Sequence, residues 1–526
     1  MLNLHRRPLA VPAAMPDDPA DVCLIVEGCY PYIAGGVSSW LDWLMRTQDD
    51  LEFSLVAIVS GSEPRQSRYE KPDNLLFVRD LILGGEPYSG PGADRSHKAA
   101  RIGPRLADAL SRLFSGGGID EFREIIAIVD SPDEPLSLHD LLDSPLTIQI
   151  AREMYNSLMP HASFLQFYWA WRALCGGLFK TLKFDLPKAK VYHTISTGYA
   201  GLLAARATIE HGAHSLITEH GIYTNERRIE ILMSEWISDT VDKGLNIDDC
   251  RLDLRDLWIQ AFESYAKICY AASSRITTLY GDNQQLQTAL GAAPERLLVI
   301  ANGIDVAKFS CLETAPADGR PTMALIGRVV PIKDTQSFII AAGEVRRKVP
   351  DLRALVMGPT DEDPLYFDEC RQLVQDLGLD DCVEFTGGVR ITDWLPSIHV
   401  VVLSSLSEAQ PLVLLEAGAA GIPCVATNVG ACREIIEGAG TPDDPIEHGG
   451  IVAGLGSPAE LATHVSTLLE NTALRRRMGE ALRSRVERRY ATEMSSAKYR
   501  ELYRGILTRG VEPVGVVALS QAEGAE

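Results

Sequence analysis

Residues 404–437 read SSLSEAQPLVLLEAGAAGIPCVATNVGACREIIE, and the organisation of the chain follows from this stretch. Two carboxylates, Glu408 and Glu416, flank Pro411 with seven residues between them. Proline fits the first turn of a helix, where its missing N–H would have no partner. We therefore expect Glu408 in the loop before a helix and Glu416 about one turn inside it. Free N–H groups at a helix start favour phosphate, so the stretch predicts a site for a phosphorylated ligand or, alternatively, an ordinary acidic cap.

The composition indicates a large folded protein. A chain of 526 residues with 46% hydrophobic and 23% charged residues can bury a sizeable core and suits two large α/β domains or about three ordinary ones. The net charge of −21 argues against a broad nucleic-acid-binding surface and against electrostatic adhesion to anionic lipid. The ten cysteines show no zinc-ligand spacing, so we expect reduced core residues without disulfides.

The sequence contains no pattern typical of a membrane anchor. No apolar run of signal-peptide length follows the arginine pair near the N-terminus, and no window holds about 20 uncharged apolar residues. We therefore expect a cytoplasmic protein without a membrane span, in which residues 1–20 are flexible.

The first half of the chain opens with a strand, a glycine loop and a helix. DVCLIVE at residues 21–27 is typical of a buried parallel strand, and Gly35 and Gly36 form a tight loop before an amphipathic segment. Loops at the carboxyl edge of a parallel sheet are where open α/β folds bind ligands. The same loop could also be a purely structural turn, because it lacks a complete nucleotide-binding glycine motif.

Two later strand-to-loop units carry polar side chains. KVYHTISTGY and SLITEHGIY each read as a strand, a loop and the start of a helix. These units present His193 in the first and Glu219, His220, Tyr223 and Arg227 in the second. A single histidine at a strand end is an ordinary structural residue in many proteins. Two of them on successive loops of one sheet edge indicate a site.

The second domain opens with a cationic loop. In TMALIGRVVPIKD, Gly327 ends a strand, Arg328 and Lys333 lie in the following loop, and a helix begins near Asp334. Arginine binds phosphate oxygens bidentately and lysine adds a mobile charge, so the pair suits a diphosphate. The alternative is two solvated surface cations.

An acidic tripeptide raises the question of a metal. Asp361 and Asp363 form an Asp-x-Asp pattern, which is associated with metal-dependent sugar transfer. The pattern lies in the polar stretch TDEDPLYFDE, which reads as a solvated loop. We therefore expect no metal site here.

Taken together, these motifs resemble the retaining GT-B glycosyltransferases of family 4. The resemblance rests on G-R-x-x-x-x-K at 327–333, the glutamates at 408 and 416, and the Gly430 turn with Glu434. EGCYPYIAGGVSSW, TEHGIYTNER and SEAQPLVLLEAGAAGIPCVATNVGACRE are similar to the PelF type, which contributes to exopolysaccharide synthesis. The family usually has glycine where this chain has Ala409, and alanine narrows the allowed backbone conformations.

The resemblance implies a fold class and a domain plan. It implies an α/β protein of two Rossmann-like doubly wound domains facing across a cleft. The expected parts are a first, acceptor-side domain at 21–312 with a helical insertion at about 81–158, a donor-binding domain at 313–490, a helix at 491–510 that crosses back to the first domain, and a flexible tail at 511–526.

It also implies a reaction, transfer of a hexose from a nucleotide sugar, with UDP-glucose as the expected donor, to a growing glycan. The implied catalytic residues are His193, Arg328, Lys333 and Glu408. The implied donor-binding residues are Gly35, Gly36, Gly327, Arg328, Lys333, Arg390, Glu408, Pro411, Leu412, Val413 and Glu416. The implied acceptor or sugar contacts are Glu219, His220, Tyr223 and Arg227. No cofactor or metal is expected, and membrane-embedded polysaccharide synthase subunits are candidate partners.

Two other functions compete with this interpretation. One is a non-catalytic nucleotide-sugar-binding subunit of a polysaccharide synthase complex, against which the intact Arg328, Lys333, Glu408 and Glu416 argue. The other is a nucleotide-sugar 2-epimerase, which shares the architecture. The glutamate pair with its Pro-Leu junction gives the epimerase no support.

Overall fold

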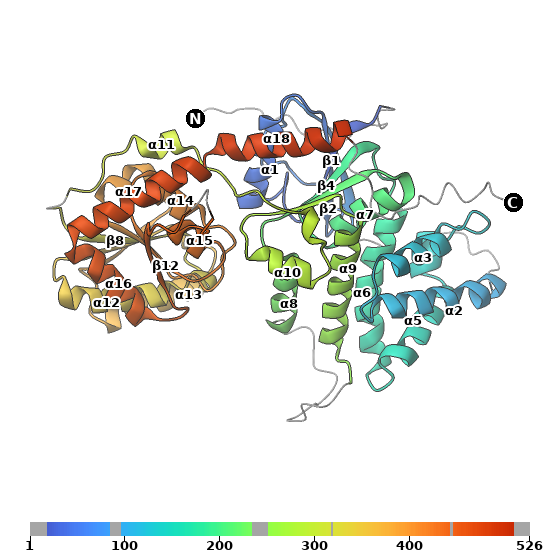
Figure 1. The fold of residues 1–526 in the computed structure, drawn as a ribbon. Helices are drawn as coiled ribbons and strands as arrows, with labels where there is room; N and C mark the ends of the chain where they lie inside the picture. Colours follow the sequence, from blue (N-terminus) through green and yellow to red (C-terminus); the bar gives the residue numbers. More distant parts are fainter. Residues whose placement is uncertain (1–17, 85–95, 234–250, 317–318, 442–444, 510–526) are drawn as a thin grey trace. The chain divides into compact units, whose positions relative to one another are not determined.

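The computed structural model describes residues 18–84, 96–233, 251–316, 319–441 and 445–509 (Figure 1). Most of the predicted N-terminal segment and the predicted tail lie outside these residues. The chain divides into two compact units. Unit 1 comprises Met1–Thr278, Gln284–Leu298 and Arg500–Glu526, and unit 2 comprises Leu279–Asn283 and Val299–Tyr499.

Unit 1 is built on a sheet that runs in the order β3-β2-β1-β4-β5-β6-β7. Its strands are β1 (Ala20–Glu27), β2 (Phe53–Val59), β3 (Leu75–Ile82), β4 (Ala189–Thr194), β5 (His214–Glu219), β6 (Arg275–Thr278) and β7 (Leu297–Val299). Neighbours from β3 to β6 pair in parallel. The strand order reverses between β1 and β4, and such a reversal opens a ligand crevice at the carboxyl ends of the strands.

Helices that alternate with these strands cover the sheet of unit 1. They are α1 (Gly36–Thr47), α7 (Tyr199–His211), α8 (Tyr223–Met233), α9 (Leu254–Ala272) and α10 (Asn283–Ala289), with a 3-10 turn η1 (Pro294–Arg296). Residues 22–26 of β1 are all buried, as expected for a strand covered on both faces. The predicted strand at 21–27 is thus confirmed.

A helical insertion separates β3 from β4. Its helices are α2 (Ser96–Leu113), α3 (Ile119–Val129), α4 (Leu138–Leu142), α5 (Pro145–Leu158) and α6 (Phe164–Lys183), and α2, α3, α5 and α6 gather beside α9 in Figure 1. The sequence analysis began the insertion at 81 and ended it at 158. The structure continues β3 to Ile82 and the helices to Lys183, because α6 buries Phe167, Trp171 and Leu178 in the same core as the sheet.

Unit 2 contains a parallel sheet in the order β10-β9-β8-β11-β12-β13. Its strands are β8 (Thr322–Ile326), β9 (Arg353–Met357), β10 (Val383–Gly387), β11 (Val400–Leu403), β12 (Cys424–Thr427) and β13 (Gly450–Ala453). Side chains alternate between its two faces: Val400 and Val402 enter one core, and Val401 and Leu403 the other. The order of this sheet reverses between β8 and β11.

The helices of unit 2 flank this sheet. They are α11 (Val306–Ser310), η2 (Pro331–Lys333), α12 (Thr335–Lys348), α13 (Pro364–Asp376), η3 (Ile391–Asp393), η4 (Leu395–Ser397), α14 (Leu412–Ala419), α15 (Cys432–Glu437), α16 (Pro458–Glu470) and α17 (Thr472–Arg489). None of the described helices of the chain combines the length and the apolarity needed to cross a bilayer.

The long continuous part of unit 2 begins at Val299, whereas the sequence analysis placed the domain boundary at residue 313. Ile304 exchanges backbone hydrogen bonds with the end of α17, accepting from Thr492 N at 3.0 Å and donating to Tyr490 O at 2.8 Å. Phe309 is buried in the same core as Leu414. The polar break at 313–320 is therefore a loop inside unit 2.

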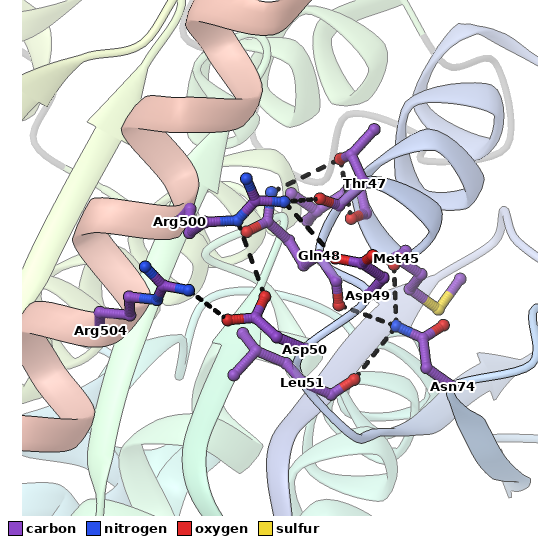
Figure 2. A network of polar contacts seen from close by, with 10 residues as sticks. Met45, Thr47, Gln48, Asp49, Asp50, Leu51, Asn74, Arg500 and Arg504 are labelled. Atoms are coloured by element: carbon purple, nitrogen blue, oxygen red, sulfur yellow. Dashed lines mark hydrogen bonds and ion pairs between the residues drawn. The ribbon is translucent and has the colours of Figure 1, made fainter.

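The last helix, α18 (Thr492–Arg509), coincides with the predicted C-terminal helix, and its residues from Arg500 onward are counted in unit 1. Figure 2 shows how they contact the end of α1: Arg500 donates to Thr47 O, and Arg504 pairs with Asp50 at 2.7 Å. Asn74 Nδ2 donates to three carbonyl oxygens of the same turn, at 2.9 to 3.1 Å. Side chains from distant segments thus bind carbonyl groups at and after the end of α1.

Candidate active site

A buried ion pair lies at the strand reversal of unit 2. Lys333 follows β8 and Glu408 follows β11, and Lys333 Nζ lies 2.5 Å from Glu408 Oε1. Ser405 Oγ donates to the same carboxylate oxygen at 2.6 Å. The two charged side chains are only 20% and 12% exposed. A cation is therefore held in place beside the start of α14 before any ligand binds.

The two loops that carry this pair are tied together. Ser404 Oγ donates to the carbonyl oxygens of Lys333 and Asp334, both at 2.9 Å. Leu406 N donates to Ile332 O at 2.9 Å. Because the loops after β8 and β11 share these bonds, the lysine and the glutamate cannot move independently.

The turn at Gly430 packs against the backbone of residues 408 and 409, in the loop that carries Glu408. A Cβ at Gly430 would lie 2.2 Å from Glu408 O and 2.4 Å from Ala409 O, and the residue has φ +52°. Ala431 N donates to Ala409 O at 2.8 Å. Among the non-glycine residues that the structure describes, only Asp334 has a positive φ. Alanine therefore fits position 409 without strain, although the resembled family usually has glycine there.

This close approach gives a testable prediction. Gly430→Ala should destabilise unit 2 by more than the ~1–3 kcal/mol expected for a left-handed backbone alone, because the 408–409 backbone has to shift. Gly378→Ala is the matched control, since Gly378 has φ +63° but open space around its Cβ position. Thermal unfolding of the two variants measures the loss of stability in each. Equal losses in the two variants would contradict the supporting role of Gly430.

Helix α14 begins as the sequence analysis predicted. Pro411 is its N-cap, Leu412 and Val413 open its first turn, and Glu416 lies about one turn inside. The N–H groups of such a first turn have no partner within the helix. Burial raises the pKa of Glu416, while Lys308 of α11 acts in the opposite direction. A half-buried carboxylate and the first N–H groups of a helix thus lie on one short element.

The remaining donor-side predictions lie on more exposed loops. Gly327 N donates to Met357 O at 2.9 Å directly after β8. The Arg328 side chain is 53% exposed and forms an ion pair with Glu362. Arg390 is exposed at the N-cap of η3. Arg328 is thus held by an acidic neighbour that a ligand would have to replace.

The Asp-x-Asp segment is engaged in local structure. Asp363 is the N-cap of α13 and accepts from Tyr366 N at 3.1 Å. The middle residue, Glu362, is the ion-pair partner of Arg328. The described part of the chain holds no cluster of three or more histidine, cysteine or acidic residues placed to bind a metal ion.

In unit 1, a cavity of about 520 Å³ opens at the reversal between β1 and β4. Residues from the carboxyl ends of β1, β2, β4 and β5 contribute to its wall. It is lined by Glu27, Gly28, Cys29, Val37, Ile58, Val59, Ser60, Leu83, Ile195, Ser196, His220, Gly221, Tyr223, Glu226 and Arg227. The volume lies within the range of small-molecule sites.

Four polar atoms of this wall are buried without a hydrogen-bond partner. They are Glu27 Oε2, Ser196 Oγ, His220 Nε2 and Arg227 Nε. Buried polar side-chain atoms in folded proteins nearly always have a partner. Four such atoms on one cavity are groups to which a polar ligand could bind.

Burial sets the protonation of the cavity wall. The pKa of His220 falls to about 4, so the imidazole is neutral at pH 7. Its ring packs edge-on against Trp40, with 4.7 Å between the ring centroids. Burial also raises the pKa of Glu27, against the attraction of Arg227, and Tyr223 OH donates to Glu27 Oε1 at 3.4 Å. The wall thus offers a neutral imidazole beside a carboxyl group that protonates more readily than usual.

His193 and Glu219 lie at the carboxyl ends of β4 and β5, with their side chains in the interior of unit 1. His193 is fully buried, with Nδ1 2.6 Å from Tyr503 OH and Nε2 2.8 Å from Thr218 Oγ1. Glu219 is also fully buried and accepts from Tyr270 OH at 2.6 Å. Neither is among the residues that line the cavity. Both side chains lie in the interior because tertiary packing supplies their partners.

The glycine loop leaves space beside the cavity. Gly35 is the N-cap of α1 and Gly36 its first residue, and a Cβ added at either would meet no atom within 4 Å. The next residue, Val37, lines the cavity. No protein neighbour therefore requires glycine at these positions, which is consistent with an approaching ligand.

The sequence analysis missed Glu27 and Ser405. Glu27 lines the cavity, and Ser405 binds the glutamate of the ion pair. Glu27 could have been found, because it is the polar end of an otherwise apolar strand. Ser405 carried no signal in the sequence beyond its place in a loop.

Comparison with known proteins places both units. Residues 20–295 match the family model described as "Domain of unknown function (DUF3492)". Residues 320–471 match the model described as "Glycosyl transferases group 1". The second match covers the ion pair, the Gly430 turn and α14.

Curated relatives align with part of the chain. A D-inositol 3-phosphate glycosyltransferase of Kineococcus radiotolerans is 28% identical over 234 residues, 40% of this chain and 53% of that protein. An exopolysaccharide phosphotransferase of Streptomyces coelicolor is 31% identical over 241 residues, 44% of this chain and 23% of that protein. The chain thus spans about half or less of the length of these relatives.

Solved structures share the fold at low identity. The structure of Anabaena HepE in complex with UDP has a TM-score of 0.55 at 14% identity and covers 92% of this chain and 99% of that chain. A sucrose-phosphate synthase of Thermosynechococcus elongatus has a TM-score of 0.54 at 15% identity, with coverage of 93% and 100%. The two doubly wound sheets agree with this likeness and confirm the fold class. Because the first family model covers more than half of its 526 residues, the chain belongs to the DUF3492 family, and its second unit is of the group 1 glycosyl transferase type.

Proposed function

We propose that this protein is a retaining glycosyltransferase that moves a hexose from UDP-glucose to a growing glycan in exopolysaccharide biosynthesis. The observation that carries the proposal is the Lys333–Glu408 pair beside the start of α14, inside the group 1 match. A neighbour in fold was solved with UDP and glucose, and one relative is named for exopolysaccharide. Retention and the Pel-like pathway rest on the family resemblance.

Unit 2 would bind the nucleotide sugar. Lys333, Arg328 and the first amides of α14 would stabilise the diphosphate as the bond from the anomeric carbon to its oxygen breaks. Glu416 would hold the ribose hydroxyls. Glu408 would contact the sugar hydroxyls through Oε2, because Oε1 is engaged by Lys333 and Ser405.

Unit 1 would bind the acceptor and the transferred sugar. The acceptor oxygen forms the new bond to the anomeric carbon, and its proton leaves with the nucleoside diphosphate. The neutral His220, with Ser196, Glu27 and Arg227, would supply the hydrogen bonds that position the hydroxyl groups. The catalytic role that the sequence analysis gave to His193 passes to His220 in this proposal.

The wider setting is part of the same proposal. The protein would work in the cytoplasm, without a metal or cofactor, and would deliver its product to membrane-embedded polysaccharide synthase subunits. Its acidic net charge of −21 favours recruitment through protein contacts over adhesion to anionic lipid.

A panel of nucleotide sugars tests the function. UDP-glucose should raise the melting temperature more than GDP-mannose, since a ligand that binds only the folded state stabilises it. The full chain should release UDP from UDP-glucose, and a chelator should leave the rate unchanged. Glu416→Ala should abolish the thermal shift.

The other outcomes separate the competing functions. Binding with no UDP release would favour a nucleotide-sugar-binding subunit, and an epimerised donor would favour the epimerase. Neither binding nor release with any donor would overturn the proposal.

A further inference from the structure

Unit 2 contains a second cavity, at the edge of its sheet opposite to the ion pair. Its volume is about 350 Å³, and its wall includes the residues just before β11 and β12. Ligands of open α/β sheets bind at the carboxyl edge, so this amino-edge cavity does not belong to the proposed donor site. Three arginines of α17 line it: Arg475, Arg476 and Arg483.

The structure shows no ion pair between these three arginines and the residues that it describes. Other arginines of unit 2 are neutralised by carboxylates: Arg346 by Asp381 and Arg433 by Glu437. One carboxylate, Glu480, lines the cavity with the three arginines. The cavity therefore keeps a positive charge inside a protein of net charge −21.

Hydrogen bonds hold two of the three guanidinium groups in place, whereas Arg476 is exposed. Arg475 is buried and donates through Nη1 to the carbonyl oxygens of Leu468 and Leu469, both at 3.2 Å. Arg483 donates through Nη2 to Ala420 O at 2.8 Å and lies across Gly421, where a Cβ would come within 2.8 Å of it. Donors held in place before binding lose little entropy when a ligand arrives.

One donor of this set has no partner. Arg483 Nε is buried and makes no hydrogen bond. Both ring nitrogens of His399, which also lines the cavity, already have partners: Nδ1 accepts from Thr322 N at 3.2 Å, and Nε2 lies 3.1 Å from Pro316 O. Burial lowers the pKa of Arg475, with Arg476 acting in the same direction, as expected where cations lack a counter-ion.

We propose that this cavity is a binding site for a small phosphate-bearing anion, separate from the nucleotide-sugar site. Arg476 and Arg483 bind the phosphate oxygens, and the buried Arg475 attracts the anion through its positive charge. Arginine suits this role because its fork matches phosphate geometry. The site lies at the C-terminal end of α14, the helix whose N-terminus carries the proposed donor site.

Calorimetric titration of the full chain with pyrophosphate, at constant ionic strength and with saturating UDP, tests the proposal. The wild-type protein should bind pyrophosphate. Arg476→Ala should weaken binding about 10-fold, as expected for a lost charge-assisted hydrogen bond. Glu480→Gln should tighten binding several-fold, because it removes the one carboxylate of the wall.

Arg477→Ala is the matched control, because Arg477 is exposed on the same helix and does not line the cavity. Its affinity should equal that of the wild type. Titrations with inorganic phosphate and with glucose 6-phosphate then tell a free anion from a phosphorylated sugar. No binding of any of the three anions, or equal affinities in the wild type and Arg476→Ala, would overturn the proposal. The binding assay needs no sugar transfer, and a loss of affinity in Arg476→Ala assigns the binding to this cavity whether or not UDP occupies the proposed donor site.

Discussion

Lys333→Ala is expected to lower kcat/KM for UDP-glucose by about 100- to 1,000-fold, the usual effect of removing one group that stabilises a developing negative charge. Lys333 is the cation that the fold holds beside α14, at 2.5 Å from Glu408 and only 20% exposed. Its removal takes a fixed positive charge from the departing diphosphate. It also leaves Glu408 without its cation, which adds an unfavourable charge where the phosphates would lie. Single-turnover kinetics with UDP-glucose measures the loss.

The control for this prediction is Lys348, the last residue of α12. Lys348 is exposed at the end of α12, and Lys348→Ala makes the same change in charge and size. It should leave kcat/KM unchanged within a few-fold. Lys333→Arg should recover only part of the activity, because the guanidinium is larger and planar. Activity of Lys333→Ala within a few-fold of the wild type would remove Lys333 from the proposed mechanism.

His220→Ala is expected to lower kcat for transfer by about 100-fold with little change in melting temperature, because His220 Nε2 bonds to no protein group and faces the cavity. The imidazole is neutral at pH 7, since its pKa is about 4. The activity of the wild type should therefore show no titration of this histidine between pH 5.5 and 8, a range chosen about 1.5 units or more above that pKa. Rates measured across this range, beside thermal unfolding of both proteins, check the two statements.

His193→Ala is the comparison that separates a cavity residue from an interior one. It removes the hydrogen bonds to Tyr503 and Thr218 and leaves a buried hole, so the protein should lose about 2–4 kcal/mol of stability. His220→Gln should recover part of the transfer rate if a polar contact is what matters. Normal transfer by His220→Ala would show that this cavity does not hold the reacting groups.

The donor side of the proposed site could be predicted from the sequence because its residues lie close together along the chain. In one strand-to-helix unit, Gly327 ends the strand and Lys333 follows six residues later. In another unit, Glu408 and Glu416 lie on either side of Pro411. The structure confirms that Glu408 precedes α14 and that Glu416 lies one turn inside it. Parallel strands bring their loops to one edge, so local order was enough to bring Lys333 and Glu408 together.

The sequence by itself thus determined the two doubly wound sheets, the loops at their carboxyl edges and the composition of the donor loops. Only the tertiary structure decided which histidine faces a ligand, since the partner of His193, Tyr503, is 310 residues away in the chain. It also decided that Glu27 carries an unpaired oxygen, that Ala409 is unstrained, and that three arginines of α17 share a cavity. The spacing of apolar residues along a strand or a helix shows which of its side chains are buried. The partners that a buried polar group finds depend on how distant segments pack.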